Sequence, residues 1–157
     1  MNCTTDSTTS CRAGLQPRLA GPKGPAHKYC RYNSSMPKVV AVIGASRHRH
    51  KFGNRALRAF ERQGFTVIPI NPHETEVEGH KTYASVLDVP GPIDMATVYV
   101  PPRQGVRVIE QLAEKGVPEV WLNPGADGPE VVARARELGL NTIQACSILG
   151  IGESPYA

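Results

Sequence analysis

The sequence has no long apolar run: its longest wholly apolar stretches, such as residues 39–43, fall far short of the roughly 18 residues that a membrane-spanning helix needs. Hydrophobic residues make up 40% and charged residues 20% of the chain. This balance fits neither a membrane protein nor a disordered chain, so we expect a soluble protein without a membrane partner. The 157 residues leave room for one compact domain, and a second catalytic domain is not expected.

Cysteine is scarce in most of the chain, because Cys3, Cys11 and Cys30 lie near the start and Cys146 stands alone. Their spacings match no zinc or haem template, and this distribution cannot cross-link the domain to itself in any obvious way. We therefore predict no metal site and a reducing compartment, the cytoplasm. Cys146 is expected to be a buried structural thiol.

Residues 38–157 lack a net charge, because they hold thirteen basic and thirteen acidic residues. The formal net charge of +4 comes from residues 1–37, with five bases and one acid. Inside the neutral part, residues 38–62 carry seven bases and one acid, which predicts a domain with one positive end. A single basic stretch without interleaved aromatic residues does not favour nucleic-acid binding.

Residues 1–36 are rich in Ser, Thr, Gly, Pro and basic residues and show no apolar periodicity. We predict that this segment is disordered and that residues 37–157 form the folded domain. A targeting peptide is one open alternative, although the segment lacks the apolar face of a transit sequence and the apolar stretch of a signal peptide. A translated leader ahead of a true start at Met36 is the other.

From residue 38 onward, short β-branched runs alternate with amphipathic helical patterns, as in βαβ units. The run at residues 39–43 ends at Gly44 and predicts a central parallel strand that is covered on both faces. Pro69 removes a backbone donor from the second run, which favours a place near a sheet edge or at the end of its strand. The pattern predicts an α/β fold, a doubly wound, Rossmann-like parallel sheet of five strands in the order 3-2-1-4-5. The expected strands are 39–43, 65–70, 93–100, 117–122 and 142–145, and the expected helices are 52–63, 102–115 and 129–138.

The loop after the first strand is the first candidate site, since ligands of such sheets bind beyond the carboxyl ends of the strands, where the strand order reverses. Gly44 permits a tight turn, Ser46 supplies a hydroxyl, and Arg47, Arg49 and Lys51 precede a helix whose amino end favours anions. The pattern predicts a phosphate-binding loop, with a solvated, mobile basic loop as the alternative. The dinucleotide fingerprint is absent, because Ser46 and Arg49 stand where it requires glycine.

The second strand ends in Asn71 and Pro72, where an NAD-binding sheet carries an acid for the ribose hydroxyls. Glu74 follows only after the proline, which disfavours NAD. Glu74, Glu76 and Glu78 are expected to form a solvated acidic loop. We assign no catalytic residue and no metal ligand, because the remaining candidates lack the partners that nucleophilic or metal chemistry needs: Ser46, Cys146, His48 and His50.

Taken in order, residues 39–46, 64–72, 79–83 and 120–122 resemble the small stand-alone CoA-binding proteins of Rossmann type. These are related to the CoA-binding domain of succinyl-CoA synthetase and of NDP-forming acyl-CoA synthetases, and the resemblance runs over about residues 38–150. It implies a non-catalytic protein that binds CoA or an acyl-CoA, with the phosphates in the loop after the first strand. The residues implied to bind the ligand are Gly44, Ala45, Ser46, Arg47, Lys51, Asn71, Pro72, Val100 and Pro101.

Two enzymatic alternatives stay open at this point: a nicotinamide-dependent oxidoreductase and a detached subunit of an NDP-forming acyl-CoA synthetase. The sequence also leaves open which acyl group is preferred and whether the domain pairs with itself as a homodimer.

Overall fold

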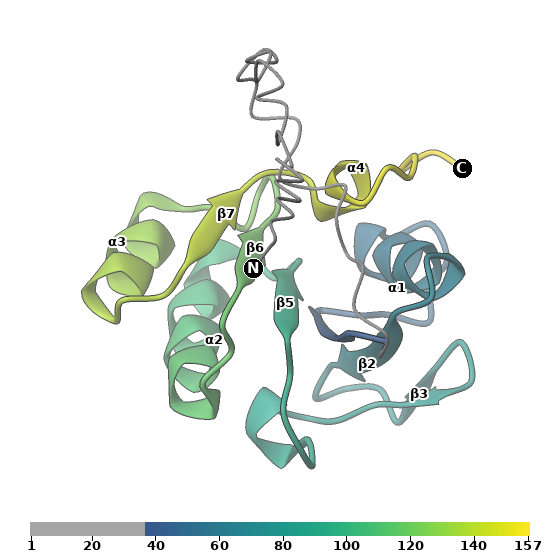
Figure 1. Cartoon of the computed structure of the whole chain (residues 1–157), viewed down its shortest axis with the longest axis horizontal. Coiled ribbons are helices and arrows are strands. Elements are labelled where there is room, and N and C mark those ends of the chain that lie inside the picture. Colours follow the sequence, from purple (N-terminus) through teal and green to yellow (C-terminus); the bar gives the residue numbers. More distant parts are fainter. Residues whose placement is uncertain (1–36) are drawn as a thin grey trace, which may run out of the picture.

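The computed structural model describes residues 37–157, so the segment predicted to be disordered and three of the four cysteines lie outside the described residues. The centre of the fold is a five-stranded parallel sheet (Figure 1). In spatial order its strands are β2 (Thr66–Ile70), β1 (Val39–Ile43), β5 (Met95–Val98), β6 (Val120–Leu122) and β7 (Thr142–Gln144). The other elements are α1 (Phe52–Arg62), β3 (Glu76–Val77), β4 (His80–Lys81), the 3-10 turn η2 (Val86–Asp88), α2 (Pro102–Lys115), α3 (Pro129–Glu137) and α4 (Ser147–Gly150).

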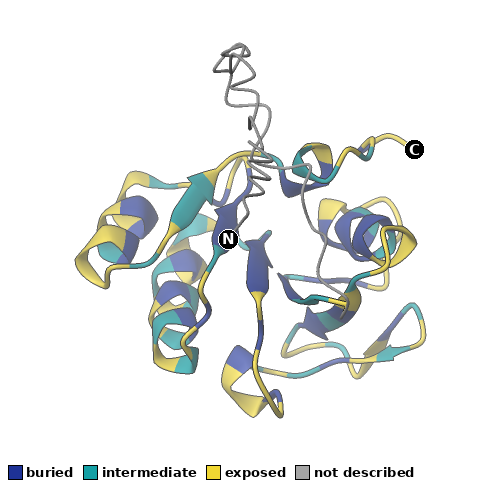
Figure 2. Ribbon diagram, viewed as in Figure 1, coloured by how far each residue is buried: buried dark blue, intermediate teal, exposed yellow. Residues whose placement is uncertain are grey.

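Helices cover both faces of the sheet, as the sequence predicts. Since successive side chains of a strand point to opposite faces, Val40 and Val42 pack into the cluster under α1 and α4, whereas Ala41 and Ile43 pack into the cluster under η2, α2 and α3. Figure 2 shows β5 fully buried while the outer surfaces of the helices are exposed. This confirms the doubly wound α/β fold with a central, two-sided β1.

The predicted strand order 3-2-1-4-5 is wrong. The third predicted strand, β5, pairs with β1 on the side opposite to β2, so that the order of these five strands is 2-1-3-4-5. The outer side of β2 is taken by Tyr83, which makes an isolated parallel bridge with Ile70. A bridge made by one residue pair produces no alternating apolar pattern, so the sequence could not predict it. Tyr83 donates its backbone N–H to the Pro69 carbonyl at 3.1 Å, so Pro69 faces the edge of β2, where a missing donor disrupts little.

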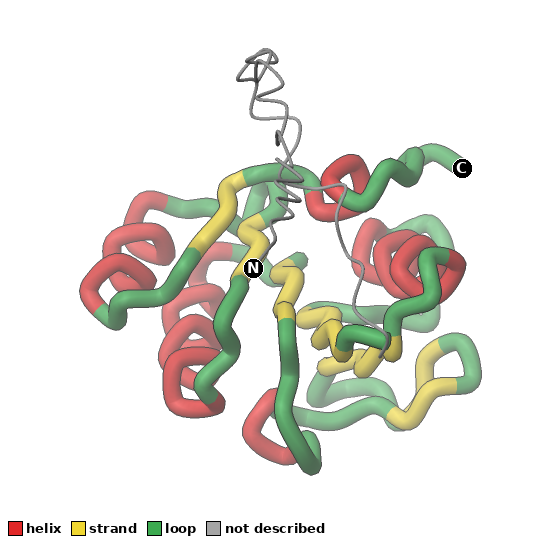
Figure 3. Tube along the Cα trace, in the orientation of Figure 1, coloured by secondary structure: helices red, strands yellow, loops and turns green. Residues whose placement is uncertain are grey.

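The sequence did not predict α4 or the hairpin of β3 and β4. A Cβ on Gly150 would lie 2.5 Å from the Trp121 ring, so α4 packs directly on this tryptophan, which is buried in the core. The segment after α4 runs along α1 (Figure 3). There Arg55 donates to the Pro155 carbonyl at 2.9 Å and Arg62 to the Glu153 carboxylate at 2.8 Å. Within residues 37–157, no helix has the length and apolar character that a bilayer crossing requires.

Candidate functional site

The turn after β1 depends on glycine at two positions. Gly44 has φ +85°, a left-handed conformation that side chains disfavour, and its N–H donates to the Ile70 carbonyl at 2.9 Å. A Cβ on Gly53, in the first turn of α1, would lie only 2.4 Å from the Gly44 carbonyl oxygen. The amino end of α1 therefore lies directly against the turn, an approach that a side chain at position 53 would prevent.

Ala45 and Ser46 follow this turn and are almost fully buried, with 0% and 4% of their surface exposed. Within residues 37–157, no hydrogen bond uses the backbone N–H of either residue as its donor. Buried N–H groups without partners are rare in folded proteins. The α1 amino end beside them carries no side-chain cap and no acid in its first turn. Unpaired donors next to the positive end of a helix dipole are groups that can bind an anion.

Two asparagine side chains form hydrogen bonds to backbone carbonyls of the loop. Asn71, which follows β2, donates to the Ala45 carbonyl at 2.7 Å and accepts from the His73 N–H at 2.9 Å. Asn54, fully buried in α1, donates to the Ser46 carbonyl at 2.8 Å. These hydrogen bonds fix both carbonyls, whereas Arg47, Arg49 and Lys51 are exposed, as in the solvated basic loop that the sequence left as an alternative.

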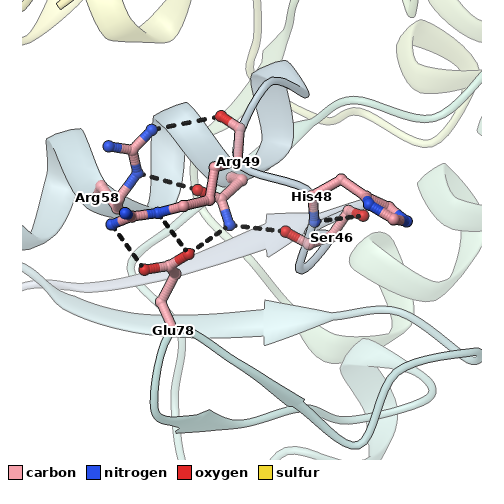
Figure 4. Close-up of polar contacts among 6 residues, drawn as sticks. Ser46, His48, Arg49, Arg58 and Glu78 are labelled. Carbon is pink, nitrogen blue, oxygen red and sulfur yellow. Dashed lines mark hydrogen bonds and ion pairs between the residues drawn. The ribbon is translucent and has the colours of Figure 1, made fainter.

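The Asn54 amide also donates to the Glu78 carboxylate at 3.0 Å, while Arg49 lies 3.2 Å from the same carboxylate (Figure 4). The hydrogen bond from Asn54, and after it the charge of Arg49, hold the pKa of Glu78 below its usual value against the opposing effect of burial. Arg47 pairs similarly with Glu74 at 3.6 Å. The prediction of a solvated acidic loop is therefore wrong for Glu74 and Glu78, whose side chains are only 14% and 21% exposed.

The structure brings only part of the predicted ligand-binding residues together. Gly44 lies against the loop after β5, because a Cβ added to it would come within 3.1 Å of the Val100 side chain. Ala45, Ser46 and Asn71 join it through the contacts above. The remaining predicted residues are exposed at the surface around this centre: Arg47, Lys51, Pro72 and Pro101.

A cavity of about 580 Å³ opens at the same carboxyl edge, on the side of β5, β6 and β7. Its lining residues are Phe52, Tyr99, Asn123, Pro124, Cys146, Leu149, Gly152, Glu153, Ser154, Pro155 and Tyr156. Cys146 packs against the core cluster under α1 and α4 but also faces this space, so it is less buried than the sequence predicts. The reason is that Cys146 begins the turn into α4, an element that the sequence did not reveal.

A buried chain of neutral polar groups fixes one wall of the cavity. Asn123 donates to the Thr97 hydroxyl at 2.7 Å and accepts from the Ser147 N–H at 2.8 Å. The Ser147 hydroxyl lies 2.7 Å from that of Thr97 and 3.0 Å from that of Tyr99. Burial raises the pKa of Tyr99 to about 12, so its phenol is neutral at physiological pH. The sequence did not predict this network. The one feature of the sequence that pointed to it was a polar residue, Asn123, directly after a buried strand.

Comparisons with known proteins identify the relatives of this domain. Residues 38–152 match the family described as CoA binding domain. Over 82 residues the chain is 40% identical to the acetate–CoA ligase (ADP-forming) II subunit alpha of Pyrococcus furiosus, a match that covers 52% of this chain and 18% of that subunit.

Two solved structures are similar in fold as well as in sequence. A conserved hypothetical protein from Pyrococcus furiosus has a TM-score of 0.65 and 30% identity, over 73% of this chain and 98% of that one. The dinucleotide-forming acetyl-coenzyme A synthetase 1 of Ca. Korarchaeum cryptofilum, in complex with phosphate and ADP, has a TM-score of 0.61 and 32% identity, over 69% of this chain and 26% of that one.

Proposed function

Because this chain belongs to the CoA binding domain family, we propose that it binds CoA or an acyl-CoA without catalysing a reaction, and that it holds the phosphates of the ligand in the loop after β1. The observation that supports this most strongly is the pair of buried, unpaired N–H groups of Ala45 and Ser46 at the amino end of α1. A diphosphate oxygen supplies the acceptors that these donors lack.

The surrounding charge favours the same ligand. Residues 38–62 have a net charge of +6, although Arg47, Arg49 and Arg62 form ion pairs with acids outside this segment. Arg47 and Lys51 are exposed beside the loop. CoA carries a diphosphate and a further 3′-phosphate, so a positive region beside the two amides attracts it at long range. Arg47 and Lys51 would then contact the outer phosphate oxygens, while Pro72, Val100 and Pro101 would flank the nucleotide and the groove.

The contacts of Asn71 argue against NAD. The amide nitrogen of this side chain donates to Ala45 and its oxygen accepts from His73, so both ends serve the loop. An acid that holds both ribose hydroxyls, as NAD-binding sheets use, has no counterpart at this strand end.

A second candidate function is that of a detached subunit of an ADP-forming acyl-CoA ligase, and the 40% identity with such a subunit favours it. The matched part amounts to 18% of that subunit, and the residues gathered at the loop are backbone amides, asparagines and paired arginines rather than a nucleophile with its base. Binding without catalysis is therefore the function we propose first. Formation of acyl-CoA and ADP in mixtures with an ATP-grasp partner would favour the second.

Isothermal titration calorimetry with CoA tests the proposal directly. We expect saturable binding that weakens with added salt, and a loss of affinity of at least about 100-fold in Ser46→Asp, which sets a carboxylate against phosphate. Asn141→Asp adds the same charge at the exposed amino end of β7 and should leave the affinity unchanged. Circular dichroism shows whether each variant is folded. Absence of binding to the folded wild type, or equal affinities of both variants, would contradict the proposal.

A further inference from the structure

Exposed apolar side chains gather at the cavity beside β5, β6 and β7. Within residues 37–157 five large hydrophobic side chains are exposed, and three of them, Phe52, Leu149 and Tyr156, line this one cavity. Their exposed fractions are 49%, 61% and 82%. A group of apolar residues that a protein keeps in contact with solvent around a concave space is typical of a ligand site.

The walls of the cavity are held in place. The side of α4 that faces the sheet is fixed by the packing of Gly150 on Trp121 and by the hydrogen bonds of buried Ser147. On the opposite side, Arg55 fixes the backbone at Pro155. A space with walls fixed on both sides does not collapse when it is empty, so it can hold a ligand without first being opened.

The cavity carries little free charge. The one carboxylic acid among its lining residues is Glu153, and its carboxylate accepts hydrogen bonds from Arg62 and Gln63, both at 2.8 Å. The phenol of Tyr99 is kept neutral by burial. An environment of this kind favours an uncharged, apolar group and disfavours a phosphate.

The cavity lies beside the loop after β1. Phe52 begins α1 and directly follows Lys51, and Tyr99 comes so close to the turn that a Cβ on Gly44 would lie 3.2 Å from its carbonyl carbon. One ligand can therefore reach from the unpaired amides of the loop into the cavity. It would be polyanionic at one end and apolar at the other.

We propose that this cavity receives the acyl group of an acyl-CoA, so that the ligand of the protein is an apolar acyl thioester rather than free CoA. The inference rests on the proposed function, because the phosphates at the loop direct the other end of the ligand toward the cavity. A volume of about 580 Å³ lies within the range of small-molecule pockets, about 300–1,000 Å³, and leaves space for an acyl chain of several carbons.

Calorimetry with CoA, acetyl-CoA and hexanoyl-CoA, in a reductant that keeps the Cys146 thiol free, measures the contribution of the acyl chain. A fully buried methylene strengthens binding about fourfold, so even partial burial of four more methylenes predicts at least about tenfold tighter binding of hexanoyl-CoA than of acetyl-CoA. In Leu149→Asp the ratio of the affinities for hexanoyl-CoA and acetyl-CoA should fall to about one. Leu138→Asp is the matched control, because Leu138 is an exposed leucine at the end of α3, outside the cavity, and the ratio should persist there.

A second probe separates the failure of this inference from that of the proposed function. Hexanoyl-N-acetylcysteamine is an acyl thioester without phosphates, and it should shift the backbone amide resonances of residues 149–154 and 156 but not those of residues 44–46. If CoA does not bind and these shifts appear, the phosphate site is wrong and the acyl site stands. If hexanoyl-CoA binds no tighter than acetyl-CoA, or if the thioester leaves residues 149–154 and 156 unshifted, the inference is overturned.

Discussion

At the β1 end of the carboxyl edge, the loop is held by asparagine amides and by ion pairs at the surface, whereas at the β5–β7 end a buried chain of neutral groups joins Thr97, Asn123 and Ser147. The arginine side chains of these ion pairs are exposed, so the pairs respond to salt. The buried chain at the second end has no charge to titrate, and its hydrogen bonds are shielded from water. The difference shows how one edge can suit a ligand whose two ends differ in polarity.

The largest loss of stability is expected from Asn123→Ala at the β5–β7 end. This change removes three buried hydrogen bonds, to Thr97, the Val98 carbonyl and Ser147. At about 1 kcal/mol each, the free energy of unfolding should fall by roughly 3 kcal/mol. Urea denaturation measures this loss. Asn141→Ala, at an exposed asparagine, is the control and should change it by less than about 0.5 kcal/mol. Equal losses would mean that the buried network does not hold this end together.

Gly53→Ala and Gly150→Ala are a matched pair, one at each end of the edge. Each new Cβ meets an atom within 2.5 Å, the Gly44 carbonyl oxygen for Gly53 and the Trp121 ring for Gly150. Overpacking of this kind destabilises by about 1–3 kcal/mol, so both should lower the melting temperature. Only Gly53→Ala displaces the loop from α1, and CoA affinity should fall about tenfold in this variant alone. An equal fall in both variants would mean that the phosphates are not bound at the β1 end.

A smaller effect, of opposite sign, is expected from Glu74→Gln. Glu74 pairs with Arg47, whose side chain is 73% exposed, and an exposed pair contributes at most about 1 kcal/mol. Removing the carboxylate frees Arg47 and lowers the negative charge near the phosphates, so CoA should bind about two- to fivefold more tightly at low salt. The gain should disappear in high salt. Titrations at two salt concentrations decide this, and unchanged or weaker binding would show that Arg47 does not contact the ligand.

The smallest effect concerns pH. The hydrogen bond from Asn54 and the charge of Arg49 lower the pKa of Glu78 below the ordinary value of 4.5. A carboxyl group with a lowered pKa stabilises the fold above its unfolded pKa, and this contribution is lost as the pH falls through the folded pKa. In Glu78→Gln, stability should therefore depend less on pH below about 4.5 than in the wild type. Identical pH profiles of the melting temperature would contradict the pairing.

Elements with a long period were predictable from the sequence, and elements fixed by a few distant contacts were not. The structure has α2 over Pro102–Lys115, as predicted, and β1 over Val39–Ile43. The order of the strands failed, because it depends on which neighbour β5 pairs with, β1 or β2, and no local pattern in these strands encodes that choice. The four residues of α4 are too few to show a helical period.

The turn of the candidate site could be predicted for a similar reason. Gly44 and Ser46 are adjacent to a recognisable strand, so their place at the carboxyl edge follows from local pattern. The ion-pair partner of Arg49 could not be predicted from local pattern. Glu78 lies 29 positions away in the sequence and approaches Arg49 only through the hairpin of β3 and β4. The cavity depends on α4 and the segment after it, and it was therefore invisible in the sequence.

A crystal structure of the full chain with CoA tests the central claim most directly. The diphosphate should lie within hydrogen-bond distance of the Ala45 and Ser46 N–H groups, against the amino end of α1, and its pantetheine arm should point toward Tyr99. A complex in which this turn is empty, or in which the phosphates lie at another edge of the sheet, would contradict the account.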